Sequence, residues 1–533
     1  MLKKRGLATS LFSHSIMELQ HFPLFLATFL TILLLIFTVK LLSKKIQAKK
    51  PTLNLPPGPW KLPFIGSIHH LIASQLPHHT LRDLAKKHGP LMHLQLGEIP
   101  TIVISSPRVA QEVLKTHDIA FTNRPELLSV KILAYNYSDI AFAPYGNYWR
   151  QMRKLCTLEL LSAKNVVSFA SIREEEAFNL VQDVESKSGS MINLTEKIYA
   201  LTNAVICRAA FGKRRKEESA YFMSLIKELS LMITGLDISE VFPSLKLLQV
   251  ITGTKEKLLK LHKKFDNVLD MIIEEHKQKL QQKYDDEESS RKYNLVNLLL
   301  KLQESGTLEF SFTTDNIKAV ILDMFLAGTE TTATVLDWAM VEMLRNPKVM
   351  EKAQTELRRI LKGKNRVRES DLKEVSYLKL VIKETLRLHP PLPLLLPREC
   401  REQCVINGYD IPIKTKVIVN AWAINRDAEF WENAESFSPE RFINCASNSS
   451  NNLEFIGQNF EYIPFGGGRR MCPGISFGLS NVELPLAQLI YYFNWKLPNG
   501  MKPEDVDVTE TPGSSCSRKY NLCVIATSND HGV

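Results

Sequence analysis

The ten residues from 465 to 474, Phe-Gly-Gly-Gly-Arg-Arg-Met-Cys-Pro-Gly, constrain the fold of this chain more than any other segment. Three consecutive glycines allow a tight turn in which backbone N–H groups approach a neighbouring atom closely. Pro473 suits the first position of a helix, and the residues that follow have helical spacing. We therefore expect Cys472 at a helix N-terminus, where the helix dipole favours a thiolate. A protected thiolate is either a nucleophile or a metal ligand, and no base lies nearby in the sequence, although a distant histidine could fold against it.

The composition indicates a folded chain with a large core, because 44% of the 533 residues are hydrophobic and 23% are charged. The net charge of +10 comes mainly from residues 1–50, which hold eight lysines and arginines and one acid, whereas the remaining residues hold 59 basic and 56 acidic side chains. The basic excess therefore flanks a hydrophobic stretch and indicates membrane topology. The sequence has no zinc-finger spacing and no basic–aromatic stripe, so we expect no nucleic-acid binding. The eight cysteines are sparse, which favours a reducing compartment.

Residues 22–42 are predicted to form a transmembrane anchor. The run from Phe22 to Val39 carries no charge, and Leu41 and Leu42 extend it to the roughly 20 apolar residues that span a membrane. The alternative is a cleaved signal peptide, but basic residues follow instead of a small-residue cleavage site. The lysines between 44 and 50 are expected to stay in the cytosol, which would leave the body on the cytosolic side.

The flanking segments complete the predicted domain organisation. Residues 1–21 form a leader, of which 1–16 would be an upstream extension if the chain starts at Met17. Residues 43–66 form a basic and proline-rich hinge, since the prolines of LNLPPGPWKLPFIG favour a stiff extended segment. The rest, 67–533, is predicted to be one large domain without an internal boundary.

That domain is predicted to be mainly α with small β-sheets. Helical patterns dominate from about 107 to 390, and the polar stretch 281–294 reads as a surface loop. Alternating residues at 91–105 predict a hairpin, and 405–419 predicts short strands around the turn Asn407-Gly408.

One long helix is predicted from Thr314-Asp315 to just before Pro347. Its apolar centre contains Glu330, Thr331 and Thr332, and buried polar groups are costly unless they are satisfied. They either bond back to the helix or serve a site. Gly328 would leave a gap beside them that suits dioxygen or water.

The segment 465–474 resembles the haem-binding loop of the cytochrome P-450 superfamily, and further motifs of that superfamily follow in order. Phe465, Gly468, Arg470, Cys472 and Gly474 match every fixed position of the loop. The other matching motifs are Trp149-x-x-x-Arg153, Ala327-Gly-Thr-Glu-Thr-Thr332, Glu384-x-x-Arg387 and Pro439-Glu-Arg441-Phe442.

This resemblance implies a cytochrome P-450 fold with a single large catalytic domain behind one N-terminal transmembrane helix. It implies haem b as cofactor, Cys472 as axial ligand of its iron, and Thr331 with Glu330 as proton-relaying catalytic residues. Glu384, Arg387 and Arg441 would form a buried structural network. The residues implied in haem binding besides Cys472 are Arg470, Phe465, Gly468, Trp149, Arg153 and Arg398, and for Arg398 a surface salt bridge is the alternative.

The similarity is strongest to the plant microsomal branch that includes sesquiterpene and diterpene hydroxylases. It implies a single-pass protein of the endoplasmic reticulum membrane that takes O2 and receives electrons from NADPH through a cytochrome reductase. Arg150 and Lys154 would either dock that reductase or form a solvated face. The segments expected to line the substrate cavity are 121–137, 233–252, Asp323 to Thr332, Leu392 to Leu396 and Pro512 to Cys516.

The expected activity is hydroxylation of an apolar plant specialised metabolite. A terpenoid fits the apolar lining best, and an alkaloid, a lignan or another phenolic stays open. A haem-thiolate isomerase or dehydratase and a non-catalytic haem protein are the alternative functions. The proton-relay pair Thr331 and Glu330 argues against the first.

Overall fold

The computed structural model describes residues 31, 53–72, 76–212, 216–232, 238–245, 251–282, 294–306, 308, 310–443, 459–513 and 515–529. The predicted leader, almost all of the predicted anchor and most of the predicted loop 281–294 lie outside these residues. The chain divides into two compact units, Met1–Asn54 and Leu55–Val533, and the fold below is that of the second unit.

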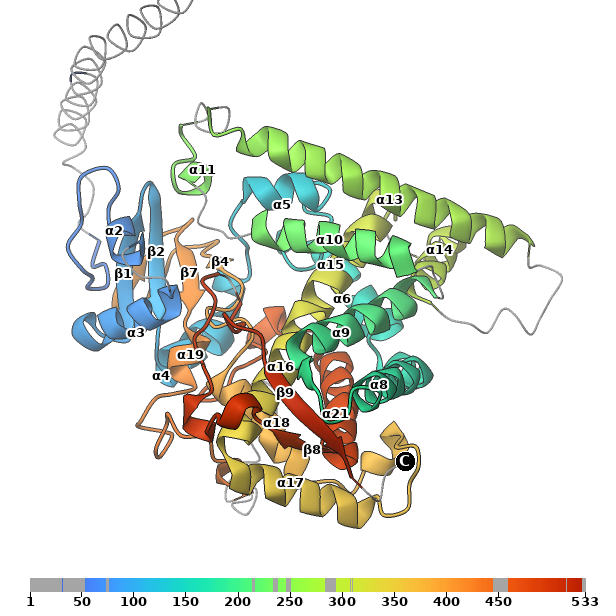
Figure 1. Cartoon of the computed structure of the whole chain (residues 1–533). Coiled ribbons are helices and arrows are strands. Elements are labelled where there is room, and N and C mark those ends of the chain that lie inside the picture. The colour runs from blue at the N-terminus through green and yellow to red at the C-terminus, as the bar shows by residue number, and fades with distance from the viewer. Residues whose placement is uncertain are drawn as a thin grey trace, which may run out of the picture. The chain divides into compact units, whose positions relative to one another are not determined.

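Helices build most of this unit, as the sequence predicts (Figure 1). They are α2 (Ile68–Ile72), α3 (Pro77–His88), α4 (Pro107–Gln111), α5 (Leu128–Leu133), α6 (Asn147–Leu155), α7 (Ala163–Ser168), α8 (Ala170–Glu185), α9 (Leu194–Phe211), α10 (Lys216–Met232), α11 (Ile238–Val241), α13 (Thr254–Gln282), α14 (Leu295–Ser305), α15 (Thr314–Gly328), α16 (Glu330–Arg345), α17 (Pro347–Ile360), α18 (Tyr377–Leu388), α19 (Ala421–Ile424) and α21 (Ile475–Tyr492).

A four-stranded sheet has the order β1-β2-β7-β4. The predicted hairpin is present as β1 (Leu91–Leu96) and β2 (Ile99–Ile104), which pair antiparallel. β7 (Lys416–Val419) joins β2 in parallel, and the two-residue strand β4 (Arg398–Glu399) pairs with β7 in antiparallel fashion. This sheet therefore holds Arg398 at an edge strand.

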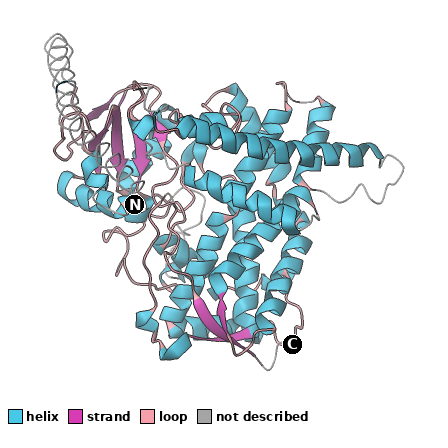
Figure 2. Ribbon diagram, turned by 45° about the horizontal axis from the view of Figure 1, so that its top comes forward, coloured by secondary structure: helices cyan, strands magenta, loops and turns pink. Residues whose placement is uncertain are grey.

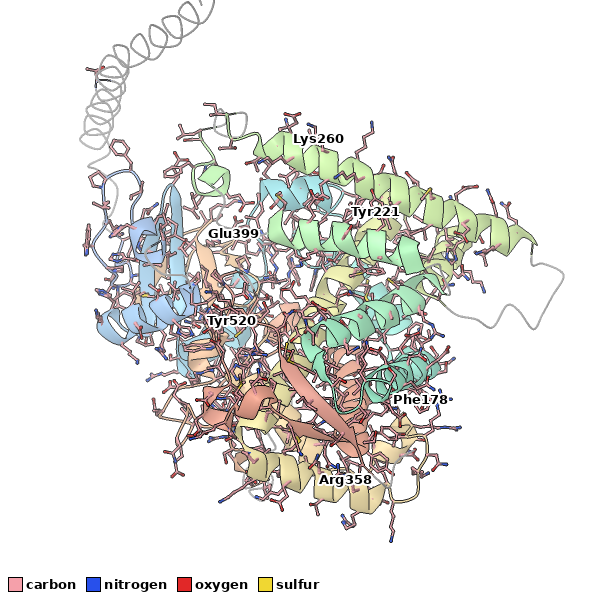
Figure 3. All side chains as sticks on the ribbon, viewed as in Figure 1. Phe178, Tyr221, Lys260, Arg358, Glu399 and Tyr520 are labelled. Atoms are coloured by element: carbon pink, nitrogen blue, oxygen red, sulfur yellow. The ribbon has the colours of Figure 1, made fainter. Side chains whose placement is uncertain are left out.

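Two smaller sheets complete the fold. β3 (Met191–Asn193), β9 (Cys523–Ser528) and β8 (Phe493–Lys496) form one in that order, and β5 (Cys404–Ile406) with β6 (Tyr409–Ile411) forms the other. Asn407 and Gly408 turn between β5 and β6 with φ of 48° and 79°, as the predicted tight turn requires. Figure 2 shows the strands as minor additions to the helical body. Arg358 of α17, labelled in Figure 3, donates to the backbone oxygen of Phe493 at 3.1 Å and so joins α17 to β8.

The helices α15 and α16 run through the centre of the unit, where the sequence predicts one long helix. The start is confirmed, because Thr313 and Asn316 form a capping box. The helix is not continuous, however, since Thr329 separates α15 from α16 with φ −85° and ψ −69°. The hydroxyl of Thr331 donates to the carbonyl of Ala327, and such back-bonding bends helices. α15 packs in one core cluster with α9, α10 and α13, and α16 packs in another with α9, α18 and α21.

Among the described residues, the one helical stretch long and apolar enough to cross a membrane is Thr314–Arg345, which is the pair α15 and α16. Because 61% of its most apolar window is buried inside the protein, it is a core element.

Candidate haem-thiolate site

The turn before Cys472 is held by close backbone approach. Gly468 has φ +66°, and a Cβ atom there would lie 2.3 Å from the carbonyl oxygen of Leu114 and 2.5 Å from Oδ1 of Asp118. Glycine is therefore required at this position for both conformation and space. The N–H of Cys472 donates to the oxygen of Phe465 at 3.0 Å, which closes the loop on itself.

The helix after Cys472 starts later than predicted. α21 begins at Ile475 with Gly474 as its N-cap, so Pro473 is not its first residue. The N–H of Gly474 is directed at the sulfur of Cys472. Burial raises the pKa of Cys472, and the Gly474 hydrogen bond and the charge of Arg153 oppose this rise. Without a bound metal, burial therefore favours the Cys472 thiol more than the expected helix dipole favours the thiolate. Binding to a metal cation would remove the thiol proton.

Four arginines gather beside this loop. Arg470 donates through Nε to Thr122 O at 2.8 Å and through Nη2 to Ala143 O, and Arg398 donates to Gly467 O at 2.6 Å and to Asp118 at 3.3 Å. Arg153 donates to Met471 O, next to Cys472. The structure thus brings together the three arginines that the sequence predicted.

Arg124 is the fourth member, and the sequence reasoning missed it as a cofactor residue. The residue is 8% exposed, and its guanidinium donates to Ala141 O, Leu396 O and Pro397 O at 2.7–2.9 Å. Neighbouring Asn123 pairs with Glu399 of β4, which places Arg124 beside Arg398 (Glu399 is labelled in Figure 3). The sequence offered one signal: Arg124 stands between Asn123 and Pro125, in the segment 121–137 that was assigned only to substrate lining.

The charges of these arginines are poorly balanced within the protein. Burial lowers the pKa of Arg470 to about 9, and the charges of Arg398 and Arg153 contribute to this shift. Burial likewise lowers the pKa of Arg124 well below its usual range, with further contributions from Arg470 and Arg398. Most of their hydrogen bonds go to backbone carbonyls, and within the part of the chain that the structure describes Asp118 is the one carboxylate that bonds to a member of the group, through Arg398. A ligand with two carboxylates, as haem has, therefore fits this arrangement.

Trp149 supports the same group of arginines. Its Nε1 donates to the oxygen of Ile140 at 3.0 Å, and the Arg470 guanidinium lies 4.2 Å from its ring centroid. The N–H of Ile140 donates to Asp323 of α15 at 2.7 Å. Asp323 was expected in the substrate lining, yet its carboxylate holds this loop. Burial and the nearby Asp139 raise its pKa well above the usual range.

The predicted oxygen-handling segment lies at the break between α15 and α16. Ala327 is exposed although it lies in the middle of the core helices, so the helix borders open space there. The Thr331 hydroxyl bonds back to the helix, which is the first of the two roles expected for these polar side chains. Glu330 instead accepts a hydrogen bond from Ser515 Oγ at 2.6 Å. A Cβ at Gly328 would lie 2.7 Å from Ile206 Cδ1, so this glycine serves close packing against α9 rather than the expected gap.

The hydrogen bonds of the predicted structural network are present; Glu384 and Arg387 are fully buried, and the side chain of Arg441 is 12% exposed. Arg387 donates to both oxygens of Glu384 at 2.8 Å, and Arg441 donates to Oε1 at 3.0 Å. Ser438 N donates to the same carboxylate at 2.8 Å. Glu384 is thus saturated with donors, as a buried carboxylate requires.

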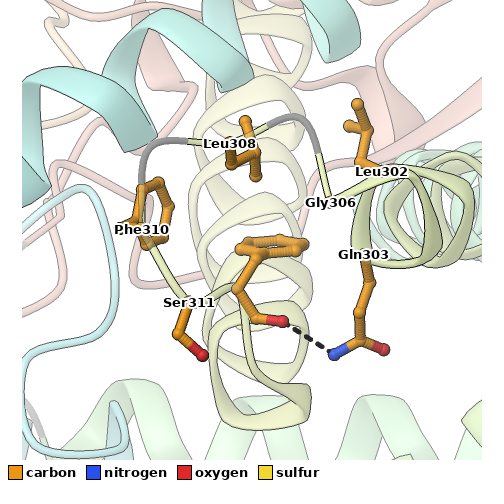
Figure 4. A pocket seen from close by; sticks show the side chains of 7 residues that line it. Leu302, Gln303, Gly306, Leu308, Phe310 and Ser311 are labelled. Atoms are coloured by element: carbon orange, nitrogen blue, oxygen red, sulfur yellow. Dashed lines mark hydrogen bonds between the residues drawn. The ribbon is translucent and has the colours of Figure 1, made fainter.

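Two further surface features bear on function. Arg150 and Lys154 are exposed on a face of α6 distinct from the one that carries Trp149. A pocket of about 440 Å³ is lined by Leu302, Gln303, Gly306, Leu308, Phe310, Ser311 and Phe312 (Figure 4). Gln303 closes one side by donating to Phe312 O at 2.9 Å. None of the predicted site residues lines this pocket.

Comparison with known proteins agrees with this geometry. The family model described as Cytochrome P450 matches residues 56–524. Premnaspirodiene oxygenase of Hyoscyamus muticus is 55% identical over 487 residues, which cover 91% of this chain and 95% of that protein. Desmethyl-deoxy-podophyllotoxin synthase of Sinopodophyllum hexandrum is 53% identical over 511 residues, covering 96% and 98%. A zebra fish cytochrome P450 structure with progesterone has a TM-score of 0.71 at 24% identity and covers 85% of this chain and 99% of that one, which shows the fold.

Proposed function

Because the chain belongs to the cytochrome P450 family and is a haem-thiolate monooxygenase, we propose that it hydroxylates a terpenoid of plant specialised metabolism. We further propose that its electrons come from NADPH through a reductase. The observation that carries the proposal is the partly buried Cys472, which lies beside four arginines whose described hydrogen bonds go mostly to backbone carbonyls.

Each haem-binding residue has a distinct part in this proposal. Cys472 would supply the sulfur ligand of a bound haem, and Phe465 and Gly468 shape the loop that presents it. Arg124, Arg153, Arg398 and Arg470 would bind the haem carboxylates, with Trp149 fixing Arg470. When bound, the haem activates dioxygen, and its thiolate ligand favours O–O cleavage.

Proton delivery is assigned to the break in the central helix. The Thr331 hydroxyl can turn from Ala327 O toward the adjoining open space and donate there. Glu330 would resupply that proton, and Ser515, which donates to Glu330 at 2.6 Å, would link Glu330 to the C-terminal loop. Thr331 would give up its hydroxyl proton and take one from the protonated Glu330, and the resulting Glu330 carboxylate would take its next proton from solvent.

Membrane attachment and the reductase partner rest on separate features. The apolar run 22–42 with its following lysines supports a single-pass anchor in the endoplasmic reticulum membrane and a body on the cytosolic side. The exposed pair Arg150 and Lys154 would steer an acidic reductase toward α6.

The substrate class rests on the relatives and on the apolar residues near the site. Leu394 and Leu395 are hydrophobic and pack at the edges of two core clusters, which supports an apolar ligand. The similarity to premnaspirodiene oxygenase favours a terpenoid. The similarity to desmethyl-deoxy-podophyllotoxin synthase makes a lignan the second candidate.

The test is product analysis with the full chain, a plant reductase and NADPH in membranes, offered a panel of terpenes, lignans and alkaloids under 18O2. We expect one labelled oxygen in a terpenoid product and a thiolate-type Soret band in the reduced carbon monoxide complex. Cys472→Ser should lose both, whereas Cys523→Ser, a change at a thiol outside the site, should keep both. Conversion of a substrate without NADPH would identify an isomerase or dehydratase instead. A haem-loaded protein that converts no compound of the panel would contradict the proposed substrate classes.

A further inference from the structure

A second group of ligand-type side chains lies apart from the residues assigned to haem. It consists of His78 and His79 of α3, His389 just after α18, and Glu510 and Cys516 of the segment before β9 (Figure 1). Four of the five are buried, and His79 is 36% exposed. Histidine nitrogen, cysteine sulfur and carboxylate oxygen are the ligand set of zinc in proteins.

The ligand atoms already lie close together. One atom each from His389, Glu510 and Cys516 fall within 4.8 Å of one another, and the same holds for His78, His79 and Glu510. Nε2 of His78 lies 2.6 Å from Oε2 of Glu510, which connects the two sets. Ligands around a tetrahedral zinc ion lie roughly 2.0–2.3 Å from the metal, so His389, Glu510 and Cys516 are near enough to share one ion, whereas His78 contacts this set through Glu510 and has to move toward it to bind the same ion.

His389 is oriented as a metal ligand would be. Its Nε2 hydrogen bonds to Oε1 of Glu342 at 2.9 Å, and its ring stacks on Trp338 with centroids 3.7 Å apart and planes at 3°. Its Nδ1 is buried and has no hydrogen-bond partner among the described residues. Histidines that bind zinc through one ring nitrogen usually hydrogen-bond to a carboxylate through the other, as His389 does to Glu342.

Cys516 is held just as firmly. Its N–H donates to Pro391 O at 3.0 Å, and its carbonyl accepts from Trp338 Nε1 at 2.6 Å. Its side chain is fully buried against Trp422 and Ala423. Its thiol donates to Glu510, and Arg426 supplies positive charge nearby. Two anions, Glu510 and a Cys516 thiolate, would balance a divalent ion in this buried place.

We propose that His389, Glu510 and Cys516, with His78 as the fourth ligand, bind one divalent metal ion of the zinc class. Binding replaces the S–H proton of Cys516, which leaves to solvent, and breaks the hydrogen bonds from Cys516 and His78 to Glu510. His79 stacks on Trp422 at the exposed side, 3.7 Å from Glu510, and gives the ion its entry.

The ion would clamp the C-terminal segment to α3 and to the end of α18. Ser515, adjacent to Cys516, donates to Glu330 at 2.6 Å, so the clamp would also fix the position of that donor. The site is independent of the haem, because none of its ligands is among the residues assigned to haem binding.

The experiment uses the full-length, haem-loaded protein in detergent, purified without a metal-chelating tag, incubated with micromolar zinc and freed of excess zinc. Mass spectrometry of the elements gives the zinc-to-iron ratio, and zinc-edge X-ray absorption gives the ligands. We expect a ratio near one and a sulfur shell at about 2.3 Å with nitrogen or oxygen at about 2.0 Å. Cys516→Ser should reduce retained zinc at least 10-fold, whereas Cys523→Ser should retain it.

The proposal is overturned if the wild-type protein keeps no stoichiometric zinc, or if the spectrum has no sulfur shell, which would indicate zinc at the surface only. Equal retention by the two variants would overturn it as well, and the five side chains would then form a hydrogen-bonded network alone. The zinc-edge spectrum of the wild-type protein tests the proposal even if Cys516→Ser fails to fold. The carbon monoxide spectrum of each sample shows whether haem is retained, so loss of zinc is distinguished from loss of haem.

Discussion

Replacing Gly468 with alanine tests whether the cysteine loop depends on close backbone approach. The φ of +66° costs alanine about 1–2 kcal/mol relative to glycine. The new Cβ would also lie 2.3 Å from Leu114 O and 2.5 Å from Asp118 Oδ1, both far inside contact distance. Relieving such overlap typically costs about 1–3 kcal/mol, so the expected destabilisation is about 2–5 kcal/mol in total.

The shift should also reach the haem site. Asp118 accepts from Arg398 at 3.3 Å and from the N–H of Arg469 at 3.0 Å, so moving its carboxylate disturbs the arginine group. We therefore expect Gly468→Ala to lower both the thermal midpoint and the fraction of protein with a thiolate-type carbon monoxide band.

Gly363→Ala is the matched control. Gly363 has φ +77°, but no atom lies within 4 Å of its added Cβ, so alanine there carries only the conformational cost of about 1–2 kcal/mol. Thermal unfolding and carbon monoxide difference spectra of both variants in the same membranes measure the effect. If Gly468→Ala matched Gly363→Ala in both readings, the claim that space decides this position would be wrong.

Three further predictions concern buried charges. Glu384→Ala leaves the guanidiniums of Arg387 and Arg441 without their carboxylate and should destabilise the fold by about 3–5 kcal/mol. We expect this variant to lose haem incorporation, and a stable, haem-loaded variant in the carbon monoxide assay would refute this. Arg124→Gln should weaken haem retention, measured by transfer of haem to apomyoglobin, while a transfer rate equal to that of the wild type would remove this arginine from the site. Burial raises the pKa of Asp139 to about 6, above its unfolded value near 3.9, so the folded protein binds this proton more tightly and loses stability as pH rises between about 4 and 6. Asp139→Asn should therefore gain stability relative to the wild type across that interval, and a difference in thermal midpoint that does not change with pH would contradict the assignment.

Local signals in the sequence were sufficient for much of the fold. The alternation at 91–105 and the Asn407-Gly408 turn predict the strands found, since side-chain periodicity and positive φ are local properties. The network of Glu384 and Arg387 was predictable for the same reason, because residues three apart share a helix face. The break at Thr329 was not predictable, because it depends on which way the Thr331 hydroxyl turns.

The sequence alone determined that Cys472 follows a glycine turn and that Glu330 and Thr331 lie in an apolar helical stretch. Only the tertiary structure decided that Arg124 joins the other arginines, and that Gly328 makes room for Ile206 rather than for a ligand. Likewise only the fold brings His78, His389 and Cys516 together. Contacts between segments hundreds of residues apart depend on how helices and strands pack, and no periodicity or spacing within one segment encodes that packing.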